Sequence, residues 1–256
     1  QMVNFLGIMQ NEWAGAQAFS SFDTYLAPFV KTDHLTYPEV KKCIEAFIYG
    51  VNTPSRWGTQ APFSNITLDW TVPDDLAELP AIVGGKEMDF KYKDCKQEMD
   101  MVNKAFIETM IEGDANGRGF QYPIPTYSIT KEFDWSDTEN NRLLFEMTSK
   151  YGTPYFSNYI NSDMQPSDVR SMCCRLRLDL RELRKKTGGY FGSGESTGSV
   201  GVVTINMPRI AYLSQDEDEF YQRLDRLMDI SARSLHIKRE VIGKLLDEGL
   251  YPYTKR

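Results

Sequence analysis

Strand-like and helix-like segments alternate along this chain, and this alternation limits its possible folds more than any other feature. The strand-like runs are rich in β-branched and aromatic residues, and proline, glycine or other turn residues bound them. Strands are predicted at residues 63–72, 122–130, 154–161 and 200–205, and helices at residues 1–9, 36–51, 94–110, 136–150 and 214–246. Helices of this length can cross from one parallel strand to the next, so the order of segments predicts an α/β architecture.

Capping signals and apolar stripes support these helices. Thr36, Pro38 and Glu39 form a helix start, and Ser136 with Glu139 has the spacing of a capping box. Apolar residues then recur at helical spacing, and Cys43 falls within the first stripe. We therefore expect Cys43 to pack in the core. Cys95, in the first turn of the helix at 94–110, is also expected to be structural.

Composition excludes several classes of protein. The 256 residues carry a formal net charge of −7, which argues against general nucleic-acid binding. No apolar run is long enough to span a membrane, and no export signal is visible. Four cysteines are too few for a disulfide framework in a chain of this size, so a reducing cytoplasm is the expected compartment.

The ends of the sequence predict a piece of a longer protein. Gln1 to Met9 resembles the middle of an apolar helix, and the chain stops shortly after Tyr253. No linker composition divides the sequence, so residues 1–256 are expected to form one domain or part of one.

Two common site types are disfavoured. The glycine-rich run at residues 192–198 leads into a strand, whereas a phosphate-binding loop follows a strand and opens a helix. His34 and His236 have no cysteine or carboxylate at recognised ligand spacing, so no metal site is predicted in this chain.

The adjacent cysteines in the segment "SMCCRLRLD" raise four possibilities: core packing, a vicinal disulfide, a metal site or a reactive sulfur. If residues 171–179 form one alternating strand, Cys174 shares a face with Leu176 and Leu178, while Cys173 lies on the charged face. A thiol on an apolar face stays protonated, which suits hydrogen-atom transfer better than ionic attack. The residue pattern alone leaves core packing and hydrogen-atom chemistry both open.

Several long blocks resemble one family. "TPYFSNYINSDMQPSDVRSMCCRLRLDLREL", "GSVGVVTINMPRIAYL", "MVNFLGIMQNEWAGAQAFSSFDTYLAPFV" and "SRWGTQAPFSNITLDWTVP" are similar to segments of the anaerobic (class III) ribonucleoside-triphosphate reductases. The resemblance covers the middle of that family's catalytic subunit. It implies part of a ten-stranded α/β barrel of two five-stranded halves, with a finger loop that carries a cysteine into the centre.

The resemblance also implies a reaction. The family reduces ribonucleoside triphosphates to deoxyribonucleotides: a thiyl radical takes the 3′-hydrogen of the ribose, and the 2′-hydroxyl leaves as water. Cys174 best matches the thiyl position, and Cys173 would be a structural or accessory thiol. Residues 201–211 would form the strand beside the finger loop. On it, Asn206 would lie near the ribose or formate, or hold the loop, and Arg209 would meet phosphate or form a salt bridge.

Ser64, Asn65 and Asn161 lie at the ends of predicted strands and are candidate substrate contacts, with ordinary turn and capping roles as the alternative. Asn11 and Gln17, which the resemblance places in an early helical segment, are candidates for an effector site at a dimer interface. The implied partners are ribonucleoside triphosphates, ATP and deoxyribonucleotide effectors, a radical-SAM activating enzyme and a second copy of the chain.

The implied cofactors lie largely elsewhere. A glycyl radical and a zinc site would belong to a C-terminal segment outside these residues, an ATP-cone domain would precede them, and formate would be the reductant. Two alternatives remain: another glycyl-radical enzyme of the formate C-acetyltransferase type, or a nucleotide-binding fragment without activity.

Overall fold

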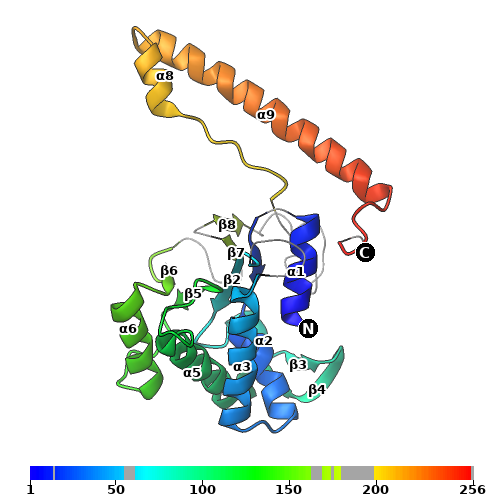
Figure 1. Cartoon of the computed structure of the whole chain (residues 1–256), viewed down its shortest axis with the longest axis vertical. Helices are drawn as coiled ribbons and strands as arrows, with labels where there is room; N and C mark the ends of the chain where they lie inside the picture. The colour runs from blue at the N-terminus through cyan, green and yellow to red at the C-terminus, as the bar shows by residue number, and fades with distance from the viewer. Residues whose placement is uncertain (14, 55–60, 163–168, 174–175, 180–198, 255–256) are drawn as a thin grey trace. The chain divides into compact units, whose positions relative to one another are not determined.

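The computed structural model describes residues 1–13, 15–54, 61–162, 169–173, 176–179 and 199–254 (Figure 1). The chain forms two compact units, Gln1–Ser196 and Thr197–Arg256. The first unit contains the sheet and the helices that pack on it, and the second contains two helices.

A parallel sheet is the centre of the first unit. Its order is β1 (Gln17–Phe19), β2 (Ser64–Leu68), β5 (Ile124–Ile129) and β6 (Tyr155–Asn158), and each adjacent pair is parallel. Because parallel strands need crossover connections, helices lie between them in sequence. The α/β prediction is confirmed, as are the strands predicted at residues 63–72, 122–130 and 154–161. In the described part of the chain, these strands form an open four-stranded sheet.

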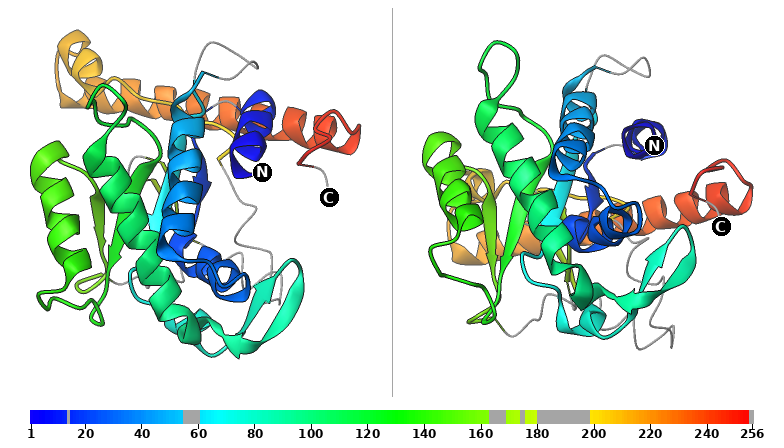
Figure 2. Two further views of the ribbon diagram at one scale, coloured as in Figure 1. Left: turned by 60° about the horizontal axis from the view of Figure 1, so that its bottom comes forward. Right: turned by 90° about the horizontal axis from the view of Figure 1, so that it is seen from below.

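Helices pack on one face of this sheet, as Figure 2 shows for α3, α5 and α6. Among the described residues of the first unit, the helices are α1 (Met2–Glu12), α2 (Phe22–Thr32), α3 (Tyr37–Asn52), α4 (Asp74–Ala77), α5 (Lys96–Glu112) and α6 (Glu139–Tyr151). A short antiparallel hairpin, β3 (Pro80–Val83) and β4 (Lys86–Lys91), leads through the 3-10 turn η1 (Tyr92–Cys95) into α5. Ile66 and Leu68 of β2 and Tyr127 and Ile129 of β5 are buried in one apolar cluster with side chains of α3, α5 and α6.

The start of α3 confirms the predicted capping box. The Thr36 backbone N–H donates to Glu39 Oε2 over 2.8 Å, and the Thr36 hydroxyl donates to the same oxygen over 2.7 Å. The stripe that follows is buried except at Cys43, which is exposed. Successive residues of a helix are about 100° apart around its axis, so Cys43 lies about 60° from Val40. It lies on the opposite side of Val40 from Ile48. The predicted core position of Cys43 is therefore wrong: three-residue spacing placed it on the flank of the stripe.

The helix predicted at residues 136–150 also forms, but its cap differs from the prediction. Thr138, not Ser136, is the N-cap of α6, and its hydroxyl accepts from the Asn141 backbone N–H over 3.2 Å. Gly152 ends the helix with a φ of 66°, in the left-handed region that favours glycine.

The two cysteines of the first unit whose side chains are described differ in accessibility. Cys95 is 0% exposed, whereas Cys43 is exposed. Burial, followed by the charge of Glu98, raises the pKa of the Cys95 thiol to about 11. We therefore expect a thiol reagent at pH 8 to modify Cys43 quickly and Cys95 only after denaturation, as read from peptide masses. Equal labelling rates in the folded chain would contradict the buried position of Cys95.

The segment around the paired cysteines is a hairpin, where one continuous strand was expected. Strand β7 (Val169–Cys173) pairs antiparallel with β8 (Leu176–Asp179), and Cys173 is the register partner of Leu176. Residues 174 and 175 lie between the strands and outside the described residues. Because alternation does not continue through a chain reversal, the assignment of Cys174 to the face of Leu176 and Leu178 no longer follows.

The second unit corrects another prediction. Residues 200–205 form no strand within the described segment 199–206, and Met207–Leu213 form helix α8. The expected strand over residues 201–211 is therefore wrong. Pro208 is in the first turn of α8, a position that suits a fixed φ and a missing N–H.

The long helix of the second unit was predicted correctly. It is α9 (Glu217–Asp247), and Asp216 caps it by accepting from the Glu219 backbone N–H over 2.8 Å. Among the described residues, neither this helix nor any other is long and apolar enough to cross a membrane.

Candidate active site

The cysteine-bearing hairpin contacts the sheet at two strands. Strand β7 lies against β1 and β2 (Figure 1). Gln17 begins β1, Ser64 begins β2, and the two are register partners. The fold thus brings β7, whose last residue is Cys173, to the pair of strands that contain Gln17, Ser64 and Asn65. Cys174 itself lies outside the described residues.

Ser64 and Asn65 share an unusual property. Each is only 1% exposed. Among the described residues, neither Ser64 Oγ nor Asn65 Oδ1 has a hydrogen-bond partner, and few other buried side-chain oxygens share this property. A buried polar atom without a partner costs free energy, so such an atom needs an explanation. A ligand that supplies the missing hydrogen bond is one explanation.

The two side chains nevertheless point in opposite directions. Successive residues of a strand alternate between faces, so Ser64 shares the helix-covered face with Ile66 and Leu68. Asn65 shares the other face with Thr67. A ligand on one face of the sheet can therefore meet only one of these two side chains within the strand.

The face that carries Asn65 is polar across three strands. Thr67 is the register partner of Thr126, and Ser128 is the register partner of Ser157. Tyr127, between Thr126 and Ser128, points to the helix side, where its hydroxyl donates to Asn103 Oδ1 over 3.0 Å. The sequence alone does not single out these hydroxyl residues. The signal was the alternation within "SNITL" and "IPTYSI", but only the register shows that the polar positions share a face.

The remaining predicted site residues lie in different surroundings. Asn161 is exposed in the turn after β6. Asn11 is exposed on α1, and its Nδ2 donates to the Gly7 carbonyl over 2.8 Å. Gln17 belongs to β1 and not to a helical segment as expected, and its Nε2 donates to the Trp13 carbonyl over 3.4 Å.

Asn206 belongs to the second unit. It is the exposed N-cap of α8, and its Oδ1 accepts from the Arg209 backbone N–H over 2.9 Å. Within its own unit Asn206 therefore caps α8, and Arg209 is exposed in the first turn of the same helix. The contact of Asn206 with ribose or formate stays a prediction.

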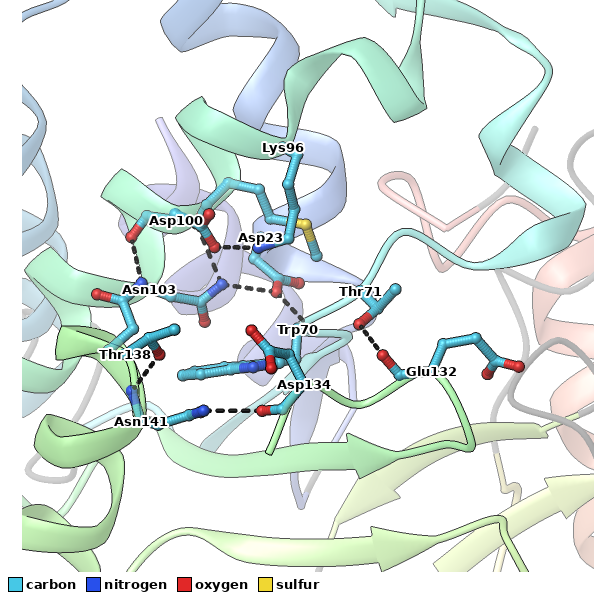
Figure 3. A network of polar contacts seen from close by, with 12 residues as sticks. Asp23, Trp70, Thr71, Lys96, Asp100, Asn103, Glu132, Asp134, Thr138 and Asn141 are labelled. Carbon is cyan, nitrogen blue, oxygen red and sulfur yellow. Dashed lines mark hydrogen bonds and ion pairs between the residues drawn. The ribbon is translucent and has the colours of Figure 1, made fainter. Parts of the chain in front are cut away.

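A buried carboxylate binds the backbone at the C-terminal end of β2, the end of the strand away from Asn65. Figure 3 shows Asp23 of α2, which is 0% exposed, directed at Asn103 and at the backbone of Trp70. The carboxylate accepts from the backbone N–H groups of Thr24 (3.0 Å), Asp69 (2.8 Å) and Trp70 (3.0 Å) and from Asn103 Nδ2 (2.9 Å). Desolvation by burial is the largest influence on this group and raises its pKa, although the hydrogen bonds oppose it.

This carboxylate holds an uncommon turn. Trp70 has a φ of 64°, which is rare for a bulky residue, and its ring stacks on Phe133 at a centroid distance of 5.6 Å. Asp23 therefore ties α2, α5 and the end of β2 together through hydrogen bonds. It is a structural anchor at the end of β2 away from Asn65.

No metal centre is formed by the residues described. Within that part of the chain, no group of three or more His, Cys, Asp or Glu side chains is placed to hold a metal ion.

Comparisons with known proteins agree on one family. The family model of anaerobic ribonucleoside-triphosphate reductase matches residues 1–256. The anaerobic ribonucleoside-triphosphate reductase of Haemophilus influenzae is 27% identical over 141 residues, which are 53% of this chain and 19% of that protein.

Solved structures of the Thermotoga maritima anaerobic ribonucleotide reductase are similar in fold. The one with citrate in its active site has a TM-score of 0.70 and 21% identity, and covers 99% of this chain and 45% of that chain. The one in complex with dATP and CTP has a TM-score of 0.63 and 21% identity, and covers 98% of this chain and 41% of that chain. The chain thus spans less than half the length of these relatives.

These likenesses confirm the predicted fold class and the predicted family. The structural likeness extends over both the sheet-containing unit and the long helix, since it covers nearly all of the chain. The match of the family model is equally complete. The 256 residues therefore belong to the anaerobic ribonucleoside-triphosphate reductase family.

Proposed function

We propose that the protein containing this chain reduces ribonucleoside triphosphates to 2′-deoxyribonucleoside triphosphates for DNA synthesis without oxygen. The observation that supports this most is the β7–β8 hairpin, whose first strand ends at Cys173 and contacts β1 and β2 of a parallel sheet in a chain of this family. Cys174 follows β7 directly in the sequence, and thiyl-radical chemistry requires a cysteine beside the substrate.

Cys174 is the proposed catalytic residue. Its sulfur radical would take the 3′-hydrogen of the ribose, which forms an S–H bond and leaves a carbon radical. The 2′-hydroxyl would then leave as water after protonation. Formate, oxidised to carbon dioxide, would supply the two electrons and the hydrogen that replace the hydroxyl at C2′, and the S–H bond would return its hydrogen atom to C3′. The glycyl radical that generates the thiyl radical, and a zinc site, would belong to parts of the protein outside these residues.

Asn65 is the substrate contact that the geometry supports best. Its Oδ1 is buried without a partner among the described residues, and it lies on the sheet face that the packed helices leave uncovered. Ser64 faces the helices, and Asn161 is exposed after β6, so both stay weaker candidates for the same role. Asn206 remains a candidate second catalytic group, beside ribose or formate.

Nucleotides are also the proposed regulators. The Thermotoga maritima reductase has been solved with dATP bound in its specificity site. By analogy, ATP and deoxyribonucleotides would act on this protein as effectors, with Asn11 and Gln17 as candidate contacts at an interface between two copies. A radical-SAM enzyme would activate the protein in the cytoplasm.

The full-length protein, activated under strictly anaerobic conditions with formate, tests this proposal. We expect it to form deoxyribonucleotides from ribonucleoside triphosphates, measured by chromatography of the nucleoside products. Acetyl transfer from pyruvate to coenzyme A without nucleotide reduction would indicate the formate C-acetyltransferase type instead. Nucleotide binding without either turnover would indicate a binding module.

A further inference from the structure

The side chain of Asn52 joins two segments that are 70 residues apart in the chain. Asn52 is the last residue of α3, and its Oδ1 accepts from the backbone N–H groups of Gln121 (3.1 Å) and Tyr122 (3.0 Å). Its Nδ2 donates to the carbonyl of Tyr122 and, over 2.8 Å, to the carbonyl of Ile48. An asparagine amide has two donor hydrogens and an oxygen that accepts two hydrogen bonds. All four positions are used here, so the amide is fixed in orientation.

The end of α3 is itself held on two sides. Ile48 and Val51 are each 0% exposed and belong to the apolar cluster of the first unit. Gly50 faces α1, and a Cβ atom at this position would lie 2.7 Å from Val3 Cγ2, so the absence of a side chain allows the close approach of the two helices. Asn52 therefore ties residues 121 and 122 to a helix that is packed against both the core and α1.

The segment held in this way leads directly to the start of β5. Ile124, two residues after Tyr122, is the register partner of Asn65. The Tyr122 ring meets the Phe63 ring edge to face at a centroid distance of 5.3 Å. The Phe63 carbonyl in turn accepts from the Gln17 backbone N–H over 2.9 Å. These contacts join the first residues of β1, β2 and β5.

The same end of the sheet carries the proposed substrate contact. Among the described residues, Asn65 Oδ1 has no hydrogen-bond partner. No bond to this oxygen holds it, so the backbone of β2 and its pairing with β5 set its position. Hydrogen bonds weaken steeply with misalignment, and a displacement of about 1 Å is enough to impair the positioning of a substrate. The start of β5 must therefore be held firmly for Asn65 to meet a ligand.

We propose that Asn52 is a positioning residue for the nucleotide site: it holds the start of β5 so that Asn65 stays in place for the substrate. This inference rests on the proposed function, because it takes Asn65 as a contact of the nucleotide. Asn52 itself touches neither the substrate nor the reacting atoms. In the sequence it is an ordinary asparagine near the end of a helix, and only its bonds to residues 121 and 122 indicate this role.

Asn52→Leu in the full-length enzyme tests the inference, because it removes all four hydrogen bonds and nearly preserves the volume of the side chain. We expect KM for a ribonucleoside triphosphate to rise about tenfold, the usual effect of one impaired hydrogen bond to a substrate. The turnover number kcat should change less than about twofold, since a binding contact is weakened and the chemistry is not. Steady-state kinetics well below the melting temperature of the variant measure both constants in folded protein. Asn52→Ala serves if Asn52→Leu does not fold.

A double-mutant cycle shows whether Asn52 acts through Asn65. In the Asn65→Ala enzyme the contact is already lost, so the addition of Asn52→Leu should change KM less than about twofold. Asn140→Leu is the matched control, because Asn140 Nδ2 also donates to a distant backbone group, the Asp100 carbonyl, over 3.1 Å. Asn140 belongs to α6 and has no bond to residues 121 and 122, so its replacement should leave KM unaltered whatever it costs in stability.

The possible results separate the positioning role from the proposed function. An unaltered KM in Asn52→Leu or in Asn65→Ala, or effects of the two changes that simply multiply, would overturn the positioning role while wild-type turnover keeps the proposed function. An equal rise of KM in Asn140→Leu would also overturn it, because any loss of packing would then have the same effect. A wild-type enzyme without ribonucleotide turnover would overturn both.

Discussion

Cys174→Ser in the full-length enzyme is expected to abolish ribonucleotide reduction while folding, nucleotide binding and the glycyl radical persist. Serine is nearly the same size as cysteine, so packing changes little. Its O–H bond, however, is much stronger than the S–H bond and cannot act as the hydrogen-atom relay. Deoxyribonucleotide formation, the melting temperature and the radical signal in electron paramagnetic resonance measure the three consequences separately.

The neighbouring thiol provides the matched control. Cys173→Ser should keep measurable turnover, because Cys173 ends a paired strand and matches the family's thiyl position less well. If Cys174 were only a core residue, its serine variant would lose about 1–3 kcal/mol of stability and keep its activity in the folded fraction. Turnover in Cys174→Ser combined with loss in Cys173→Ser would move the thiyl position one residue upstream. Turnover in both variants would refute a thiyl role for either.

Asp23→Ala is expected to cost the largest amount of stability of any single change considered. It removes the acceptor of four hydrogen bonds, so the backbone N–H groups of Asp69 and Trp70 lose this acceptor, and Asn103 Nδ2 keeps only its bond to the Met99 carbonyl. Each unsatisfied buried donor costs about 1–3 kcal/mol, so we expect a loss of roughly 4 kcal/mol or more in the free energy of unfolding. Urea denaturation followed by Trp fluorescence measures it, because Trp70 lies beside the lost carboxylate.

Two variants make this prediction specific. Asp33→Ala changes an exposed aspartate at the end of the same helix and should alter stability by less than about 0.5 kcal/mol. Asp23→Asn keeps the size of the side chain and serves if Asp23→Ala does not fold. A loss below about 1 kcal/mol in Asp23→Ala would mean that the carboxylate does not anchor the turn.

The stability contribution of Asp23 should also depend on pH. Burial raises the pKa of this carboxyl above its ordinary value of 3.8, so the folded protein binds this proton more tightly than the unfolded chain does. The stability that this tighter proton binding contributes is complete below about pH 3.8, and it is lost as the pH rises through the folded-state pKa. The stability difference between wild type and Asp23→Asn should therefore be larger in acid than at neutral pH. A difference that grows with pH would contradict the direction of the shift.

Local features of the sequence predicted much of the fold. Thr36 and Glu39 mark the start of α3 because a capping box involves only residues within one helical turn. The strands β2, β5 and β6 were found because alternation and turn residues are also local. The family followed from long blocks of sequence, which need no three-dimensional information.

Only the tertiary structure decided which residues meet. Cys43 satisfied the helical spacing but lies on the flank of its helix, since burial depends on the neighbouring elements. Residues 200–205 have strand-forming side chains, but a strand also needs a partner, and none pairs with them among the residues described. The alternating run around Cys174 turned out to be two paired strands, because hydrogen-bonded pairing, not side-chain pattern, sets where a strand ends.

The candidate site shows the same division. Asn65 could be singled out by family resemblance, whereas Thr126 and Ser128 appear as ordinary strand residues in the sequence. Their common face with Asn65 depends on the register of β2 against β5, in which Asn65 pairs with Ile124 and Thr67 with Thr126. A shift of one residue would turn these hydroxyls to the helix side. Register between strands about 60 residues apart is set by the packing of Ile66, Leu68 and Tyr127 under the helices, and no local pattern contains it.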